Sequence, residues 1–469
     1  MTMPSSRLQL SALLLWFLGL LPLSAPVLAQ QRVAPDTARG RQLQEVIVQG
    51  DRPLEAGAAT VQRITPAQVA RADADAAASL ARLIPAAHVP TNSRGETLVY
   101  LRNAGERQAA FFLDGALLNV PWDNRVDLSL LPAGVIGAMT VAKGPASIEY
   151  GANVLGGVIN FTSPAVYGRR TRVQGRLGTQ RRLAGSALHT GNTGRISYAA
   201  SVGYQQQDGI PVSADADLPF SQADADLRTN TDAKIANAFA RIAYGLTRTT
   251  SVGLTLLHVD AAKGVAPESH LDPSQNAPRY WRYPEWRSTM GVLSGEGRLG
   301  IGTAWKASAW ASGFGQHIEQ YGSAAYETPT ARQEDDDRTM GARFTLRQSL
   351  GPGAVRLTGN ALTSTHAQRD LSLNASGQPT AGVPAMRYRQ QLLSGGAVYE
   401  ADVSRLHIEA GAGYDLMRMP ETGDKPARDA FTDYNLTFGA RYEAAAWFAR
   451  GAAGRKTRFP TMRELFGEA

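Results

Sequence analysis

Alternation of apolar and polar residues is the feature that most constrains this chain. Between residues 170 and 469 the alternation recurs in one segment after another. One segment places apolar side chains at every second position, at Leu406, Ile408, Ala410, Ala412, Tyr414 and Leu416. A period of two puts one kind of side chain on each face of a strand. The pattern therefore predicts a large antiparallel sheet with one apolar face.

Two architectures use such a sheet, a water-soluble sandwich and a membrane barrel. Several segments run for ten residues or more, which suits a tilted strand that spans lipid. Short connections (191–194, 351–353) contrast with long ones (208–232, 261–287), as in outer-membrane barrels. Aromatic residues lie near segment ends, as interfacial girdles require, at Tyr198, Tyr204, Tyr414, Tyr434 and Trp447. These details favour the barrel over the sandwich.

The N-terminus has the three parts of an export signal. Arg7 precedes an apolar run over residues 8–23, and small residues precede a cleavage position after Ala29. A retained membrane anchor is the alternative, but the run is short and contains Pro22. After Ala29 no apolar run reaches the roughly 18 residues of a spanning helix. We therefore predict a signal peptide over residues 1–29 and a mature chain that crosses no membrane as a helix.

Composition excludes several kinds of site. The 469 residues include no Cys, which rules out disulfides, Cys-ligated metals and a Cys nucleophile. The net charge of +7 comes from scattered basic residues, so nucleic acid is not an expected partner. The seven His are isolated in sequence and predict no metal site of their own.

Residues 30–165 are predicted to form a separate unit that contains both helix and strands. A polar segment over 30–52 contains a short β-prone run at 45–48. A helix is then predicted over 67–84, ended by Pro85, and strands are predicted over 97–101, 109–113, 137–141 and 157–162. The glycine-rich stretch 143–160 suits tight turns and close backbone approach. A phosphate-binding loop is the alternative, but the stretch lacks the Lys-Ser/Thr pair of a P-loop.

Several stretches resemble one family, the TonB-dependent outer-membrane receptors. Residues 141–160 resemble the end of the family's plug, and residues 100–102 and 112–115 are similar to its centre. Residues 458–466 are similar to a segment inside the family's barrel. The hexapeptide Leu43, Gln44, Glu45, Val46, Ile47 and Val48 looks like the TonB box, although an ordinary first strand is the alternative. The departures are Asn103, Lys143, Gly137, Ala138 and Thr140, which put individual plug salt bridges in doubt.

The resemblance implies a fold and a set of plug residues. It implies an N-terminal segment with the TonB box over 30–52, an α+β plug domain over 53–165, and an antiparallel transmembrane β-barrel over 166–469. About 13 strands are expected, against about 22 in plugged transporters, so the barrel is expected to be incomplete and truncated at the C-terminus. The plug motif is expected at Arg102, Asp114, Gly115, Lys143, Gly144, Tyr150, Gly151, Gly156 and Gly157.

The resemblance also implies a function. A receptor in the outer membrane of a Gram-negative cell would import a scarce nutrient, most simply a ferric siderophore, with cobalamin, haem or another metal chelate as alternatives. TonB, energised by ExbB and ExbD, would pair with the extended TonB box by strand addition. A passive barrel or adhesin is the alternative if the box is not functional. A barrel lipase or protease would need Ser, His and an acid together, and no motif predicts one. We therefore expect no enzyme.

Two groups of residues are candidate binding sites. Aromatic and Arg side chains that could stack on a ligand are Arg94, Trp122, Tyr280, Trp281, Arg282 and Trp286, with Trp122 expected at a plug apex and residues 280–286 in a long loop. Asp side chains that could bind Ca²⁺ are Asp208, Asp215, Asp217, Asp224 and Asp226, although external loops are often rich in Asp. No other cofactor is expected. The acidic run at 334–337 is predicted to be a solvated loop end.

Overall fold

The computed structural model describes residues 60–467, apart from 145–147, 180, 214 and 223–225. All of them belong to one compact unit, residues 43–469. The predicted signal peptide and TonB box lie outside the described residues. Within the described part, no helix is both long and apolar enough to cross a membrane.

The N-terminal part is built on a small five-stranded sheet with the order β1-β6-β7-β4-β5. Its strands are β1 (Thr60–Ile64), β4 (Ala109–Leu113), β5 (Ala116–Leu117), β6 (Ala138–Lys143) and β7 (Gly157–Thr162). β4 and β7 pair in parallel, and the other neighbours pair antiparallel. A separate ladder joins β2 (Ala87–His88) and β3 (Tyr100–Leu101). The strand predicted over 97–101 is therefore reduced to its last two residues.

The helix predicted over 67–84 is wrong in its length, because two short helices occupy this range. α2 (Pro66–Ala72) begins with a capping box, in which Thr65 and Gln68 satisfy each other's backbone N–H groups. It ends at Asp73, whose left-handed backbone (φ 46°) stops the helix. α3 (Ala77–Ala81) follows after Ala76 forms a β-bridge to Pro132. Tertiary pairing therefore overrides the helical propensity of the alanine-rich run.

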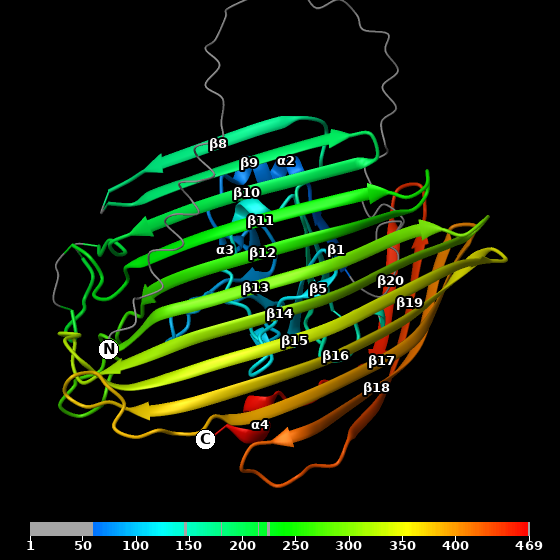
Figure 1. The fold of residues 1–469 in the computed structure, drawn as a ribbon. Coiled ribbons are helices and arrows are strands. Elements are labelled where there is room, and N and C mark those ends of the chain that lie inside the picture. Colours follow the sequence, from blue (N-terminus) through cyan, green and yellow to red (C-terminus); the bar gives the residue numbers. More distant parts are fainter. Residues whose placement is uncertain (1–59, 145–147, 180, 214, 223–225, 468–469) are drawn as a thin grey trace, which may run out of the picture. The chain divides into compact units, whose positions relative to one another are not determined.

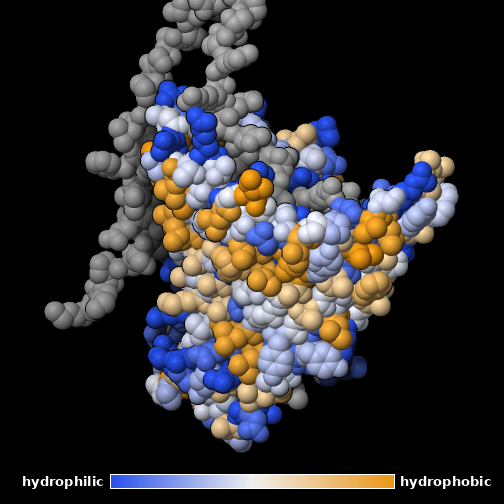
Figure 2. All heavy atoms as spheres, turned by 90° about the vertical axis from the view of Figure 1, so that its right-hand side faces the viewer, coloured by the Kyte–Doolittle hydropathy of each residue, from blue (hydrophilic) through white to orange (hydrophobic). Residues whose placement is uncertain are grey.

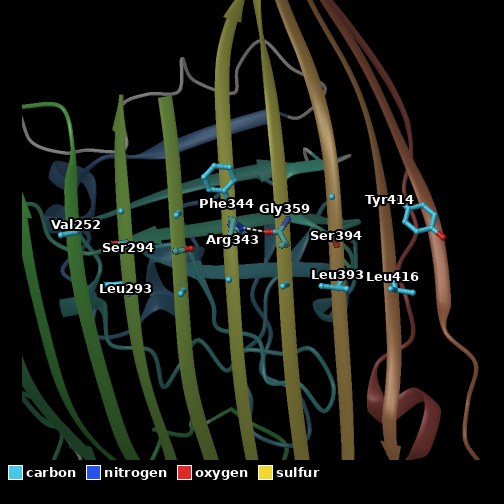
Figure 3. Close-up of a pocket in the computed structure, with 18 residues that line it drawn as sticks. Val252, Leu293, Ser294, Arg343, Phe344, Gly359, Leu393, Ser394, Tyr414 and Leu416 are labelled. Carbon is cyan, nitrogen blue, oxygen red and sulfur yellow. Dashed lines mark hydrogen bonds between the residues drawn. The ribbon is translucent and has the colours of Figure 1, made fainter. Parts of the chain in front are cut away.

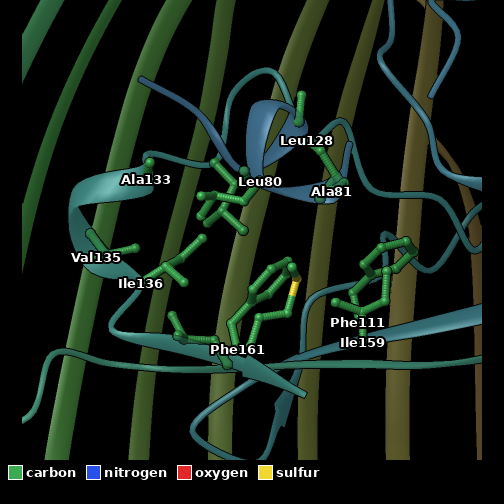
Figure 4. Close-up of a cluster of buried hydrophobic side chains, with 14 of the residues drawn as sticks. Leu80, Ala81, Phe111, Leu128, Ala133, Val135, Ile136, Ile159 and Phe161 are labelled. Atoms are coloured by element: carbon green, nitrogen blue, oxygen red, sulfur yellow. The ribbon is translucent and has the colours of Figure 1, made fainter. Parts of the chain in front are cut away.

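The core of this unit lies between α3 and the small sheet (Figure 4). Leu80 from the helix, Phe111 from β4 and Phe161 from β7 are almost completely buried in one cluster. The 3₁₀ turn η3 (Ala133–Val135) closes the cluster on one side. Two further 3₁₀ turns are η2 (Glu106–Gln108) and η4 (Ile148–Tyr150).

The described residues after this unit form a 13-stranded sheet in which each strand pairs with its neighbours in the chain. This confirms the prediction of about thirteen strands, and the alternative of a two-layered sandwich is wrong. The strands are β8 (Arg170–Leu177), β9 (Leu183–Thr193), β10 (Ile196–Gln207), β11 (Ala233–Gly245), β12 (Ser251–Gly264), β13 (Trp281–Arg298), β14 (Thr303–Tyr321), β15 (Pro329–Leu350), β16 (Gly353–Ser372), β17 (Met386–Val403), β18 (Leu406–Thr422), β19 (Phe431–Glu443) and β20 (Phe448–Arg455).

The faces of this sheet are reversed relative to a soluble protein. In β19 the apolar Leu436 and Phe438 are 48% and 54% exposed, whereas Asn435 and Thr437 between them are buried. The same alternation holds along β18 up to Leu416, and hydrophobic residues form patches on the surface seen in Figure 2. An apolar outward face and a polar inward face are the pattern of a transmembrane barrel.

The inward face of the sheet holds the N-terminal unit (Figure 1). Early strands contact it through Arg176 on β8, which pairs with Asp73 and Asp75. Late strands contact it through Gly396 on β17 and Gly413 on β18, where an added Cβ would lie within 3 Å of the Ile148 side chain. Because both ends of the sheet touch the same unit, the sheet wraps around it as a wall around a plug.

Two expectations about connections were wrong. The long loop predicted over 261–287 is shorter, because β12 continues to Gly264 and β13 begins at Trp281. The acidic run 334–337 is not a loop end but part of β15, with Asp335 and Asp337 buried. β15 is long enough to extend beyond the apolar band, so its alternation of inward and outward side chains continues through charged residues. The predicted loop 208–232, in contrast, lies between the end of β10 and the start of β11.

Candidate functional site: the plug and its contacts with the wall

The turn at Asp114 and Gly115 joins β4 to β5 and contacts the wall. Both residues have positive φ, 49° and 89°, which suits a tight hairpin turn. The carboxylate of Asp114 accepts hydrogen bonds from the backbone N–H of Ser163 at 3.0 Å and from Thr255 Oγ1 on β12 at 2.9 Å. A predicted plug-motif residue therefore ties the end of β7 to a strand of the wall.

Arg102 and Lys143 hold the edge of the plug sheet together. Arg102 Nη2 donates to Thr60 Oγ1 at 2.7 Å, and Lys143 Nζ donates to the carbonyl oxygen of Pro85 at 2.8 Å. Burial of the ammonium group, together with the nearby charge of Arg102, lowers the pKa of Lys143. Lys143 thus bonds a neighbouring loop of the plug, although a Lys departs from the family pattern.

The glycines of the 143–160 stretch permit close backbone contacts. A Cβ at Gly157 would lie 2.3 Å from the carbonyl oxygen of Ala142, and one at Gly156 would lie 2.6 Å from Ala104 Cβ. Gly144 and Gly151 have positive φ, 99° and 76°. Any L side chain at these four positions would meet a neighbour or a strained backbone.

The segment after these turns is anchored to strands β15–β17. Glu149 pairs with Arg356 on β16 at 2.9 Å, and the same Arg pairs with Glu400 on β17 at 2.9 Å. The guanidinium of Arg343 on β15 lies over the Phe112 ring at 4.1 Å and over the Tyr150 ring at 5.3 Å. The plug thus supplies one of the two carboxylates that pair with Arg356, and the two rings that cover Arg343.

A cluster of charges links the plug to the outer half of the wall. Arg125 contacts Glu96 at 3.0 Å, Glu106 at 3.2 Å and Asp123 at 3.3 Å. Burial raises the pKa of Glu96, and the negative charge of Asp123 acts in the same direction. Lys263 on β12 donates to Asp127 at 2.5 Å and to the carbonyl oxygen of Gly95 at 2.6 Å.

Trp122 lies beside this cluster and stacks on wall residues. Its ring centroid is 4.2 Å from that of His366 on β16 and 5.3 Å from that of Tyr388 on β17. His366 is hydrogen-bonded to Asp337 on β15 at 2.5 Å, and both side chains are buried. Sequence reasoning missed His366 and Asp337. Alternation across residues 335–345 would have placed Asp337 on the inward face.

The other predicted ligand-binding residues fall into separate surroundings. Arg94 and Trp281 come together, with the guanidinium 5.4 Å from the ring centroid, and Arg279 lies over the same ring. Tyr280 donates or accepts a hydrogen bond with Ser221 at 2.8 Å. Arg282 is occupied by a bidentate pair with Asp232, and Trp286 packs edge-on against Phe314. Arg94 and Trp281 of the predicted set therefore share a contact.

Residues 458–466, which are similar in sequence to a segment of the family's barrel, pack against the plug. They contain helix α4 (Met462–Phe466), and the backbone N–H of Arg463 donates to the carbonyl oxygen of Trp122 at 2.8 Å. Glu464 lies 3.5 Å from Arg107 of the plug and bonds Arg458 at 2.7 Å. Partial burial opposes ionisation, but the bonds from Arg458 and Thr461 prevail and lower the pKa of Glu464 to about 2.

The calcium prediction stays a prediction. Asp208 is paired with Arg181 at 2.7 Å, and Asp215, Asp217 and Asp226 lie in the same connection between β10 and β11. Asp224 is outside the described residues. Among the residues that the structure describes, no group of three or more His, Asp or Glu side chains could hold a metal ion.

Comparison with known proteins agrees with this geometry. Residues 53–158 match the family model described as TonB-dependent Receptor Plug Domain. The match covers the unit that lies on the inward face of the sheet. Residues 53–158 are therefore similar to the plug domain of the TonB-dependent receptors. The vitamin B12 transporter BtuB of Vibrio vulnificus (strain YJ016) is 28% identical to this chain over 125 residues, which are 26% of this chain and 20% of that protein.

Solved structures share the fold of this chain at low sequence identity. The copper transporter OprC matches with a TM-score of 0.70 and 14% identity, over 85% of this chain and 64% of that chain. The FrpB iron transporter from Neisseria meningitidis matches with a TM-score of 0.68 and 12% identity, over 85% and 65%. The ferric citrate transporter FecA matches with 0.67 and 15%, over 86% and 63%. The chain thus spans less than two thirds of each of these structures.

Proposed function

We propose that this receptor takes part in energised import of a scarce metal chelate across the outer membrane. The observation that carries the proposal is the anchoring of the 143–160 stretch to the wall by Glu149, Arg356 and the glycine contacts. These charged contacts fix the plug at defined points of the wall, beside an apolar cluster that the plug shares with β10–β14. A passive pore would have no use for such a plug.

The expected sequence of events follows from the two faces of the plug. A ligand binds at the outer end, where Trp122, Arg94 and Trp281 lie near the charge cluster around Arg125. The TonB box, residues 43–48, then pairs with TonB by strand addition. Force from the ExbB and ExbD complex remodels the plug, and the ligand passes unchanged. No bond in the ligand is broken, so no catalytic residue is assigned.

A ferric siderophore is the proposed ligand class, with cobalamin or haem as alternatives. Relatives are named as transporters of vitamin B12, copper, iron and ferric citrate, so the family's ligands vary. The stacked Trp122 and the pair of Arg94 with Trp281 suit a planar or anionic chelate.

Deletion of Glu45–Val48 tests the energised mechanism. Without these residues no strand is available to TonB, so uptake should fall at least tenfold while ligand binding at the cell surface stays unchanged. The measurement is uptake and binding of a radiolabelled ferric siderophore or cobalamin by cells that carry the intact gene or the deletion. A matched deletion of four residues from the preceding segment, 34–37, should leave both unchanged. Uptake that survives the Glu45–Val48 deletion contradicts the proposal.

A further inference from the structure

Two connections at one end of the wall are folded together. Residues 226–232 lead into β11, and residues 265–280 join β12 to β13. Arg228 of the first segment donates a hydrogen bond to the carbonyl oxygen of Pro267 in the second. We call these two segments together the outer cap. Long connections are external in outer-membrane barrels, so the cap lies at the external end of the wall.

Asn230 joins the two segments of the cap through its side chain. Its Nδ2 donates to the carbonyl oxygen of Val265 at 2.7 Å and to that of Trp281 at 2.8 Å, where the second segment leaves β12 and enters β13. Its Oδ1 accepts a hydrogen bond from Arg282. Because carbonyl oxygens only accept and a guanidinium only donates, these partners fix the orientation of the amide. One side chain therefore closes the neck of the second segment.

The backbone around Asn230 is shaped for this residue. Its φ is 57°, a left-handed conformation that Asn and Gly adopt more readily than most residues. The end of β12 lies directly against it, since a Cβ at Gly264 would be 2.3 Å from Asn230 Oδ1. The contact between the two segments is thus a close fit and leaves no room for a larger residue at position 264.

The cap contacts one turn of the plug, residues 91–97, which we call the plug turn. Arg279 Nη1 of the cap donates to Ser93 Oγ at 2.5 Å. The guanidinium of Arg94 lies 5.4 Å from the ring centroid of Trp281, the residue whose carbonyl oxygen Asn230 holds. Asn230 is therefore connected to the plug turn through Trp281.

The plug turn is closed by bonds of its own. Asn92 Oδ1 accepts hydrogen bonds from the backbone N–H groups of Arg94 at 2.9 Å and Glu96 at 3.0 Å. Thr91 forms a β-bridge with Thr97. A turn closed in this way moves as a unit, so contacts at its tip hold all of it.

We infer that Asn230 is a positioning residue, which makes the outer cap one body and holds Trp281 against the plug turn. The cap and the plug turn are then coupled, and a change in one loosens the other. The inference rests on the proposed function in one respect, because Trp281 is a candidate ligand contact there. The coupling itself requires neither a ligand nor TonB.

Hydrogen exchange of the purified full chain in detergent, followed by mass spectrometry, tests this coupling. Asn230→Gly keeps the left-handed backbone and removes only the amide. We expect exchange at least about fivefold faster in residues 265–280 and in the plug turn, with β12 and β13 unchanged. Arg279→Gln, which removes an exposed contact with Ser93, should accelerate the same two regions. Unaltered exchange of the plug turn in both variants overturns the inference, whatever uptake experiments show.

Asn230→Asp distinguishes the hydrogen bonds from the shape of the side chain. Asp has the same size and still accepts from Arg282, but it places an oxygen where Nδ2 donates to the two carbonyl groups. This variant should therefore accelerate exchange of the cap and the plug turn as Asn230→Gly does. Exchange at the unaltered rate would show that side-chain shape alone matters, which contradicts the positioning role.

Two variants are matched controls. Asn374 accepts hydrogen bonds from the backbone N–H groups of Ser376 and Gln378 in its own connection, so Asn374→Gly should affect that connection alone. Leu293 is on β13, about 40 Å along the strand from Trp281, and lines an apolar groove of about 880 Å³ on the side away from the plug (Figure 3). Leu293→Ala should leave the plug turn unchanged. Acceleration of the plug turn in either control equal to that in Asn230→Gly contradicts a specific coupling.

Discussion

Replacement of Gly157 by Ala is expected to lower the free energy of unfolding of the plug by about 3 kcal/mol or more, from backbone strain and overpacking together. The new Cβ would lie 2.3 Å from the carbonyl oxygen of Ala142 and 3.0 Å from Leu101 Cδ1, and φ is +142°. Ala142 is in β6 of the plug sheet, and Leu101 is in β3 of the separate two-stranded ladder. The strand pairing of β6 and β7 must therefore shift to accept one methyl group.

Thermal unfolding in detergent, followed by circular dichroism, measures this effect. For a domain of about 100 residues the loss should lower the melting temperature by roughly 10 °C or more. Gly134→Ala is the matched control, because an added Cβ there meets nothing within 4 Å. If the two variants melt at the same temperature, the close approach at Gly157 does not constrain the plug.

Replacement of Arg356 by Gln is expected to loosen the plug from the wall. The side chain is 7% exposed, and its loss leaves Glu149 of the plug and Glu400 of β17 without their shared partner. Breaking a buried pair by removal of one partner costs about 3–5 kcal/mol. Because Glu149 belongs to η4, the expected result is faster hydrogen exchange in residues 148–160, with the pairing of β15 and β16 preserved.

Hydrogen exchange followed by mass spectrometry measures the exchange rates of the plug and of the wall separately. Arg347→Gln is the control, since Arg347 also pairs with Glu400 at 3.0 Å but is 35% exposed and lies against the wall alone. The double variant Arg356→Gln with Glu149→Gln should lower the free energy of unfolding by less than the sum of the two single variants, because the two side chains interact directly. Equal exchange in the Arg356 and Arg347 variants would show that the pair does not anchor the plug.

The sequence predicted those features that depend on local pattern. Alternation within β18 predicted a sheet with one apolar face, and the strand predicted over 109–113 is β4. The loop 208–232 was bounded correctly because Asp208 and Gly209 interrupt the alternation at its start and Asp232 does so at its end.

Features that depend on tertiary pairing could not be predicted. The alanine-rich run 67–84 has helical propensity throughout, but the bridge from Ala76 to Pro132 divides it. The run 334–337 reads as a solvated loop, since its burial depends on the plug that faces Asp335 and Asp337. Likewise, the contact of Glu149 with Arg356 joins residues more than 200 positions apart, and the stacking of Trp122 on His366 has no local signal.

An engineered disulfide between plug and wall tests whether the plug must move during uptake. A Cβ at Gly151 would lie 3.5 Å from Ser394 Cβ on β17, within the range of disulfides, and the chain has no native Cys. The control is Thr339→Cys with Ser364→Cys, which joins β15 to β16 within the wall. Uptake is measured in cells before and after reduction.

With Gly151→Cys and Ser394→Cys oxidised, uptake should fall at least tenfold, return on reduction, and leave ligand binding intact, while the control pair transports in both states. Full uptake with the Gly151–Ser394 bond intact would contradict a plug that is remodelled to open the path.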